Sequence, residues 1–182
     1  MTRGIRGGPT VGEVDLEPMR DLPMTASDTD RDGVRRSDPD LLPRLLADPA
    51  TRVLELRGEQ TPLRPDGRLD LRPPQPDDAD GLLVHLGLVD GIAHVATCHP
   101  APPREPVPRE ERLDAAPFAD LRTVAAQLPP QEASLFATAL GLANWHVRHP
   151  CCPRCGAATE VVQSGWVRRC PQDGSEHYPR TD

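Results

Sequence analysis

Three cysteines near the end of the sequence have the spacing of metal ligands. Cys152 and Cys155 form a C-x2-C pair followed by glycine, and Cys170 begins a second stretch of the same form, in which Asp173 stands where another cysteine would complete the pattern. In a turn of this kind two side chains can point at one ion, and the glycine supplies the positive φ that closes the turn. Two such turns joined by a hairpin are typical of a zinc ribbon.

A structural zinc site needs four ligands, and thiolates supply three of them here. Asp173 stands at the fourth position, and its carboxylate oxygen is an acceptable but harder donor, with His177 and Cys151 as the alternatives. We expect three thiolates and a carboxylate to hold zinc more weakly than four thiolates would. The sequence thus predicts a structural Zn²⁺ held by Cys152, Cys155, Cys170 and Asp173.

Two other roles for the Cys152–Cys155 pair fit the sequence less well. A disulfide would require an oxidising compartment, and the N-terminus lacks the apolar core of a secretory signal. A redox-active pair normally begins a helix that follows a strand, whereas this pair follows a predicted helix and Pro150. No stretch approaches the ~18 apolar residues of a membrane span, so we expect a soluble, cytoplasmic protein without membrane contacts.

Composition limits the size of the core and the kind of partner. The 182 residues carry a formal net charge of −7, with 37% hydrophobic and 3% aromatic residues. The apolar share lies below the usual ~45–50%. This predicts a small core, disordered ends and a stabilising element other than the packed core. The acidic balance argues against a general binder of nucleic-acid backbones, because such proteins need a basic face.

The stretches upstream of the cysteines must position them. Residues 1–38 mix charges of both signs without helical or strand periodicity, so we expect them to be mostly disordered or loosely ordered. A short helix is predicted to end near Asp48, and alternation within residues 50–58 predicts a half-buried strand.

Hairpins and two helices are predicted next. Turn residues between alternating apolar runs predict hairpins within 63–72 and 81–97. Apolar residues at helical spacing predict one helix over 118–128 and a second over 131–149. The elements together predict an α+β fold: a small β-rich N-terminal domain with two helices over residues 39–149, followed by a rubredoxin-like zinc ribbon over 150–182.

Several motifs resemble one known family. The stretches CPRCG at 152–156, GWVRRCP at 165–171 and HYPRTD at 177–182 resemble the zinc ribbon of NADH pyrophosphatases, the NAD(+) diphosphatases of the Nudix hydrolase superfamily. Similarity to the same family extends upstream to residues 142–146, 119–122 and 86–91, and more weakly to 28–31.

This resemblance implies an architecture and a reaction. Members have a β-rich N-terminal domain, a ribbon and then a catalytic Nudix domain that uses Mg²⁺ or Mn²⁺. They hydrolyse the pyrophosphate of NADH or NAD(+) to a nicotinamide mononucleotide and AMP, and some remove NAD caps from RNA 5′ ends. The resemblance therefore implies an NADH or NAD(+) substrate, a homodimer, and a Nudix domain supplied in cis or in trans.

Family site residues transfer to two further positions. Tyr178 matches a tyrosine that contacts substrate, although it could equally pack against the Nudix domain. Arg122 falls near an arginine that contacts substrate, although a surface salt bridge is the simpler role for a helical arginine. The family has an acidic residue just before the ribbon tryptophan, and this position is Gly165 here.

The Nudix box itself is absent from these 182 residues. The nearest candidates, Arg104-Glu105 and Arg109-Glu110-Glu111, are separated by prolines and cannot share one helix face. We therefore expect an accessory part of an NAD(+) diphosphatase that does not catalyse alone, whether it is a natural truncation, a fragment or half of a split enzyme. The alternative is a zinc-ribbon module that binds a protein or RNA partner.

Overall fold

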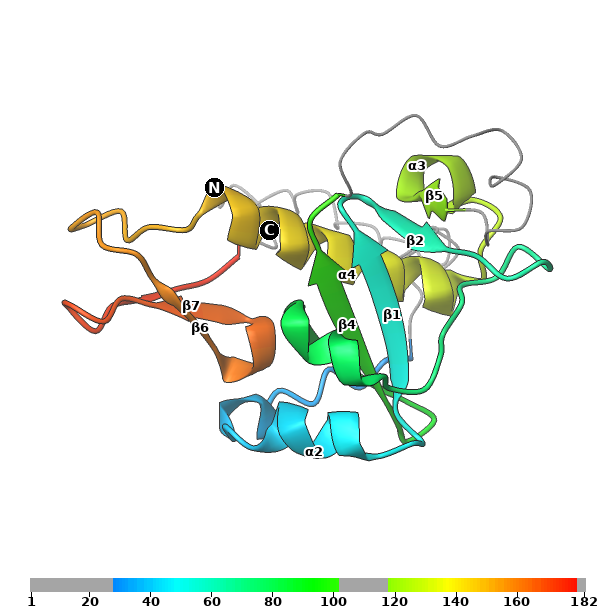
Figure 1. The fold of residues 1–182 in the computed structure, drawn as a ribbon, viewed down its shortest axis with the longest axis horizontal. Helices are drawn as coiled ribbons and strands as arrows, with labels where there is room; N and C mark the ends of the chain where they lie inside the picture. The colour runs from blue at the N-terminus through cyan, green and yellow to red at the C-terminus, as the bar shows by residue number, and fades with distance from the viewer. Residues whose placement is uncertain (1–27, 102–117, 180–182) are drawn as a thin grey trace, which may run out of the picture.

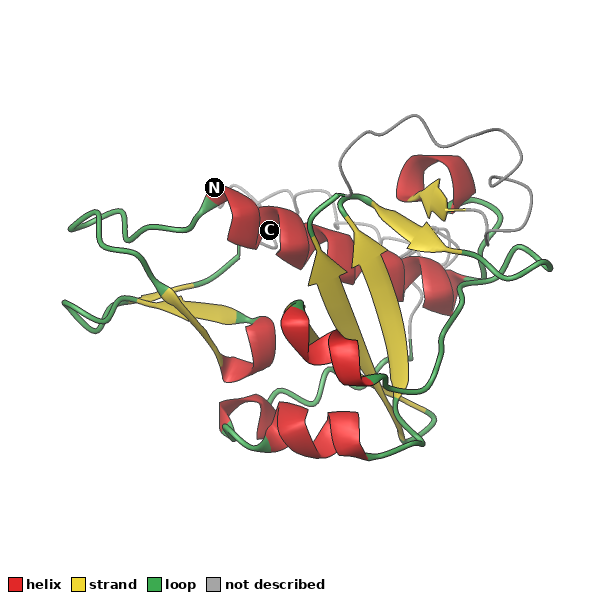
Figure 2. Ribbon diagram, in the orientation of Figure 1, coloured by secondary structure: helices red, strands yellow, loops and turns green. Residues whose placement is uncertain are grey.

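The computed structural model describes residues 28–101 and 118–179. In this part of the chain a five-stranded sheet packs on the long helix α4, and a small three-stranded sheet extends from the end of that helix (Figures 1 and 2). The predicted α+β class, with a ribbon at the C-terminal side, is confirmed.

The elements of the first unit are η1 (Arg35–Ser37), α2 (Leu41–Ala47), β1 (Arg52–Arg57), β2 (Gln60–Pro62), η2 (Pro76–Asp80), β3 (Leu82–Val89), β4 (Ile92–His99), β5 (Phe118–Asp120), α3 (Leu121–Val124) and α4 (Pro130–Arg148). Those of the ribbon are β6 (Glu160–Val162), η3 (Gln163–Gly165), β7 (Val167–Arg169) and β8 (Glu176–His177).

The large sheet has the strand order β3-β4-β1-β2-β5. Strands β1 and β4 run parallel, and the other neighbours run antiparallel. Asp90 and Gly91 join β3 to β4 with φ values of 51° and 77°, the positive angles that a tight two-residue hairpin requires. The predicted hairpin over 81–97 is therefore confirmed.

Helix α4 covers one face of the large sheet (Figure 1). Its residues Leu135, Phe136 and Ala139 are buried in one cluster with Leu54 and Leu56 of β1. Burial of such side chains stabilises the fold by roughly 1.5–3 kcal/mol each. The apolar face that the sequence predicted for this helix is thus the face that forms the core.

Helix α2 packs on the opposite face. Leu41 and Leu45 form a second buried cluster with Val95 of β4, whereas the next residue, Ala96, belongs to the cluster under α4. Successive side chains of a strand point to opposite faces, so β4 is covered on both sides.

Two predicted elements differ from the structure. The helix predicted from residue 118 begins later, because Phe118–Asp120 form β5 and pair with β2. Asp120 then caps α3, accepting a hydrogen bond from the Thr123 amide at 3.0 Å. The hairpin predicted over 63–72 is reduced to a turn with one bridge between Leu63 and Leu69.

Residues 28–38 differ from the disorder predicted for this end of the chain; residues 1–27 lie outside the described part. Asp30 forms a backbone bridge with Leu88 of β3. Asp32 accepts a hydrogen bond from the Arg35 guanidinium and lies 2.9 Å from Nε2 of His85. A backbone bridge and the contact between Asp32 and His85 therefore attach this segment to the sheet.

Among the described residues, none of the helices combines the length and the apolar character required to span a bilayer.

Candidate metal centre

The first cysteine turn closes on its own backbone. The Gly156 amide donates to the Cys152 carbonyl at 2.8 Å, and the Cys152 amide donates to the Ala157 carbonyl at 2.8 Å. Gly156 has a φ of 78°, which residues with a Cβ rarely adopt. This turn directs the amides of Arg154 and Cys155 toward the Cys152 sulfur.

The second turn repeats this pattern residue for residue. The Gly174 amide donates to the Cys170 carbonyl at 3.0 Å, and the Cys170 amide donates to the Ser175 carbonyl at 2.9 Å. Gly174 has a φ of 70°. Asp173 therefore has the same place in this turn as Cys155 has in the first.

The two turns bring the four predicted ligands together. One donor atom from each of Cys152, Cys155, Cys170 and Asp173 lies within 4.8 Å of all the others. The Cys155 and Cys170 sulfurs are 3.5 Å apart, and the Cys152 sulfur is 3.7 Å from Oδ2 of Asp173. Ligand atoms around a tetrahedral zinc with bonds near 2.3 Å are separated by about 3.8 Å, so the donors fit this ion.

Ser175 fixes the orientation of the Asp173 carboxylate. Oδ1 accepts the Ser175 amide at 2.9 Å and the Ser175 hydroxyl, while Oδ2 faces the Cys152 sulfur. The hydroxyl and amide of Ser175, together with the Cys170 side chain, hold the pKa of Asp173 well below its usual range. The carboxylate is therefore ionised, with one oxygen directed at the other ligands.

The thiols differ in how readily they ionise. Burial opposes ionisation of Cys152, but its hydrogen bonds with the Ser175 side chain and with the amides of Arg154 and Cys155 outweigh it and lower its pKa to about 6. Burial raises the pKa of Cys170 to about 11. A bound cation would favour the thiolate at both positions.

The two alternative ligands stand beside the cluster. His177 lies with Nε2 at 3.2 Å from the Ser175 hydroxyl, and it helps to lower the pKa of the Cys152 thiol. Cys151 is exposed and pairs with Ala158 through the backbone. Neither belongs to the convergent donors found among the described residues.

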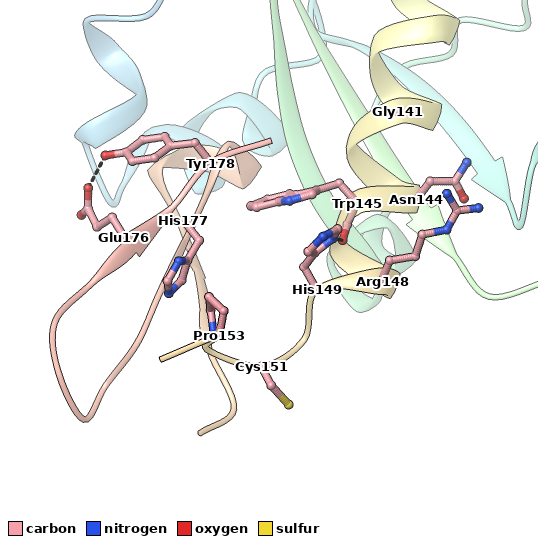
Figure 3. A pocket seen from close by; sticks show the side chains of 10 residues that line it. All are labelled: Gly141, Asn144, Trp145, Arg148, His149, Cys151, Pro153, Glu176, His177 and Tyr178. Atoms are coloured by element: carbon pink, nitrogen blue, oxygen red, sulfur yellow. Dashed lines mark hydrogen bonds between the residues drawn. The ribbon is translucent and has the colours of Figure 1, made fainter. Parts of the chain in front are cut away.

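Tyr178 lines a cavity of about 830 Å³ between the end of α4 and the ribbon (Figure 3). This residue is 59% exposed, and its hydroxyl donates to Glu176 at 2.6 Å. Trp145 extends from α4 into the same cavity, and His149 lies next to it. The cavity therefore has aromatic surfaces from both units.

Arg122 lies away from this cavity. It is exposed on α3, which packs on β5 and on α4, and it does not line the cavity of Tyr178. In Figure 1, α3 and the ribbon lie at opposite ends of the molecule. Within one chain the two predicted substrate contacts are thus not brought together.

The turn η3 attaches the ribbon to the large sheet. The Trp166 indole donates to the His85 carbonyl at 2.7 Å, and Nε2 of His146 lies 2.8 Å from the Gly165 carbonyl. A Cβ on Gly165 would lie 2.5 Å from the Leu83 carbonyl oxygen. The position where the family has an acidic residue therefore has no room for a side chain in this arrangement.

Comparison with known proteins agrees with this organisation. The family described as "NADH pyrophosphatase-like rudimentary NUDIX domain" matches residues 42–145, which is more than half of the chain. The family described as "NADH pyrophosphatase zinc ribbon domain" matches residues 148–178.

Two curated relatives share a shorter stretch. The chain is 38% identical over 64 residues to human "NAD-capped RNA hydrolase NUDT12", a match that covers 31% of this chain and 14% of the relative. The protein of the same name from Macaca fascicularis is 36% identical over 64 residues, with the same shares. The chain thus spans only a small part of the curated relatives that it matches.

The two family matches show that the chain belongs to the NADH pyrophosphatase family, of which it contains the rudimentary NUDIX domain and the zinc ribbon.

Proposed function

We propose that this chain is the accessory part of an NAD(+)/NADH diphosphatase, an enzyme that hydrolyses the dinucleotide pyrophosphate to a nicotinamide mononucleotide and AMP. The observation that carries the proposal is that a rudimentary NUDIX domain leads directly into a zinc ribbon whose four donor atoms converge.

Cys152, Cys155, Cys170 and Asp173 would hold a structural Zn²⁺, which would crosslink the two turns of the ribbon. The ribbon has few buried apolar side chains of its own, Val167 being the largest that is fully buried. A unit with so small a core is normally stabilised by a metal or disulfides. The zinc would thus replace a hydrophobic core.

Catalysis would require carboxylates that these residues do not provide. A Nudix site needs several carboxylates on one helix to hold Mg²⁺ or Mn²⁺, and no such box occurs in the 182 residues. We propose that a Nudix domain, in cis or in trans, supplies this chemistry, and that the accessory part supports a cytoplasmic homodimer and one wall of the substrate site. Tyr178 would contribute to that wall through its exposed ring.

RNA carrying an NAD cap is the second candidate substrate, because the matched human and macaque relatives are named as NAD-capped RNA hydrolases. A module that binds RNA broadly is less well supported. Arg169 pairs with Glu176 at 2.7 Å, and Arg168 donates to Thr159, so these ribbon arginines are engaged within the chain. A protein that binds RNA backbones would instead present free cations.

Metal analysis tests the ribbon. We expect about one zinc per chain in the purified protein, loss of zinc in Asp173→Ala, and retention in His177→Ala, because only Asp173 lies in the donor cluster. Zinc that is lost from His177→Ala and kept by Asp173→Ala would contradict the assignment.

A hydrolysis assay tests the accessory role. The zinc-loaded 182-residue chain is incubated with NADH and Mg²⁺ or Mn²⁺, and AMP is quantified. We expect no turnover by the chain alone. If AMP production by the wild-type chain persisted through repeated purification, the chain would be catalytic by itself and the accessory role would be wrong.

A further inference from the structure

A second cavity contains two arginines that the proposed function does not use. It has a volume of about 490 Å³ and lies where the N-terminal segment, α4 and the ribbon meet. The residues that matter for its chemistry are Arg31, Arg36, Trp145 and Trp166. It contains none of the metal ligands and neither Tyr178 nor Arg122.

Arg36 contacts the ribbon through its guanidinium group. Its guanidinium carbon lies 3.7 Å from the centroid of the Trp166 ring, and one terminal nitrogen donates to the Arg31 carbonyl at 2.5 Å. Its Nε is buried and has no hydrogen-bond partner among the residues that the structure describes. A buried donor without an acceptor is costly.

Arg31 is also incompletely satisfied. Among the described residues, its terminal nitrogens make only long contacts, 3.4 Å to the Leu86 carbonyl and 3.3 Å to the Ser134 hydroxyl, both neutral acceptors. Over residues 28–101 and 118–179, no carboxylate lies within 4.0 Å of Arg31 or Arg36. Neighbouring Asp32 is already paired with Arg35 and His85.

The cavity therefore concentrates positive charge. Burial lowers the pKa of the Arg31 guanidinium. Burial and the charge of Arg31 also lower the pKa of Arg36, against a smaller opposing effect of the Asp32 carboxylate. Both groups still remain cationic, because an arginine does not lose its proton in proteins. Asp32, whose carboxylate is already paired with Arg35 and His85, offsets this charge only in part. Two partly desolvated cations that have no ion-pair partner of their own are stabilised by an anion, and guanidinium groups match the oxygens of phosphate.

We propose that this cavity is an anion site that binds the phosphate group of a phosphomonoester through Arg31 and Arg36. Trp145 lines both this cavity and that of Tyr178, so an aromatic base attached to the phosphate has a surface to pack on. The site contains none of the predicted zinc ligands and does not require hydrolysis by the proposed enzyme.

Intrinsic fluorescence gives a direct readout, because the two tryptophans of the chain both line the cavity. Inorganic phosphate, AMP and adenosine are each titrated into the full chain and followed by tryptophan emission and by calorimetry. We expect saturable binding of phosphate and AMP and none of adenosine at the same concentrations.

AMP binding tenfold tighter than phosphate would support a nucleotide ligand, and equal affinities would support recognition of the phosphate alone. Absence of phosphate and AMP binding, or equal binding of adenosine and AMP, would overturn the proposal.

Charge-neutralising variants test the residues. We expect Arg31→Gln and Arg36→Gln each to weaken phosphate binding at least tenfold. Arg44→Gln makes the same charge change at an exposed position of α2, where Arg44 pairs with Asp38, and should leave binding unchanged. If Arg36→Gln does not fold because it loses the contact with Trp166, the phosphate affinity of Arg31→Gln tests the site by itself. Full binding by Arg31→Gln, or an equal loss in Arg44→Gln, would reject the site.

Discussion

Asp173 is the residue on which the character of the metal centre depends. It replaces the fourth thiolate of the pattern, and only Oδ2 is directed at the other ligands, because the amide and hydroxyl of Ser175 occupy Oδ1. Hydrogen bonds that orient a ligand typically change metal affinity by 10–100-fold. Ser175 therefore orients the Asp173 carboxylate, a contact that the cysteine spacing does not reveal, although an Asp-x-Ser sequence is a known local hydrogen-bonding pattern.

The role of Ser175 can be measured through zinc affinity. Ser175→Ala keeps the amide hydrogen bond but removes the hydroxyl, and we expect zinc to bind roughly tenfold more weakly in competition with a chromophoric chelator. Ser37→Ala, on η1, is the matched control and should bind zinc like the wild type. Wild-type affinity in Ser175→Ala would show that the hydroxyl does not support the ligand.

Completing the cysteine set should have the opposite effect. Asp173→Cys replaces a hard oxygen donor with a softer thiolate, so we expect zinc affinity to rise by on the order of tenfold in the same competition assay. Weaker zinc binding by this variant would mean that the second turn is shaped for a carboxylate and not for a thiolate.

At the scale of elements, the short turn η3 decides where the ribbon sits. Gln163, Ser164 and Gly165 all have positive φ, of 49°, 50° and 89°. Ser164 donates to the Arg36 carbonyl at 3.2 Å, and Gly165 lies directly against β3. Strained backbone of this kind persists only where surrounding contacts hold it.

Gly165→Ala should therefore loosen the contact between ribbon and sheet. The new Cβ would lie 2.5 Å from the Leu83 carbonyl oxygen, at a φ of 89°, and we expect the free energy of unfolding to fall by roughly 2 kcal/mol or more. Gly141→Ala is the control: within α4 its Cβ meets nothing within 4 Å, so stability should rise by up to about 1 kcal/mol. Denaturant melts compare the two, and equal stabilities would contradict the close packing of η3.

His146 connects α4 to the ribbon and should make their association sensitive to pH. Its ring lies 2.8 Å from the Gly165 carbonyl and 3.1 Å from the Arg168 guanidinium. Since the carbonyl must accept and the guanidinium must donate, the ring is neutral, with Nε2 protonated. Burial accordingly lowers the pKa of His146 below its ordinary value, as it does for His85 and His94.

Stability should consequently fall as pH decreases below about 6.5, the ordinary histidine pKa. In this pH range the unfolded chain binds more protons than the folded chain, because the buried histidines stay neutral. The free energy of unfolding therefore falls by up to about 1.4 kcal/mol per pH unit for each histidine. His146→Gln should show a shallower fall between pH 7 and 5.5 in urea melts with zinc in excess. A slope equal to that of the wild type would exclude His146 as a contributor.

At the scale of the whole molecule, the two units are stabilised in different ways. The large sheet is covered by α4 on one face and α2 on the other, with two buried apolar clusters. The ribbon consists of strands of two or three residues around the metal ligands. Stability within one chain is therefore not uniform.

Removal of the metal should affect the ribbon first. After treatment with a strong chelator, we expect amide protons in residues 151–178 to exchange at least tenfold faster, while those of β3 and β4 keep their protection. Hydrogen exchange followed by mass spectrometry separates these peptides, and restoring zinc should restore protection. Unchanged exchange in the ribbon would show that packing alone holds it, and equal loss throughout the chain would show one cooperative unit.

The sequence by itself determined the features that depend on neighbours in the chain. The C-x2-C-G stretch, the Asp-Gly turn at 90–91 and the apolar face of α4 each follow from local backbone and periodicity rules. The four residues that the spacing predicted as ligands lie with their donor atoms in one cluster. Family resemblance added the order of the two units.

The tertiary structure alone decided the features that depend on residues distant in sequence. Phe118–Asp120 lie at helical spacing with the residues that follow, yet form a strand because β2 offers an unpaired edge. Residues 28–38 lack periodicity, yet are ordered by Leu88 and His85 of β3. Arg31 and Arg36 share a cavity for the same reason: long-range contacts, which leave no periodic signal in the sequence, bring the N-terminal segment and the ribbon to one place.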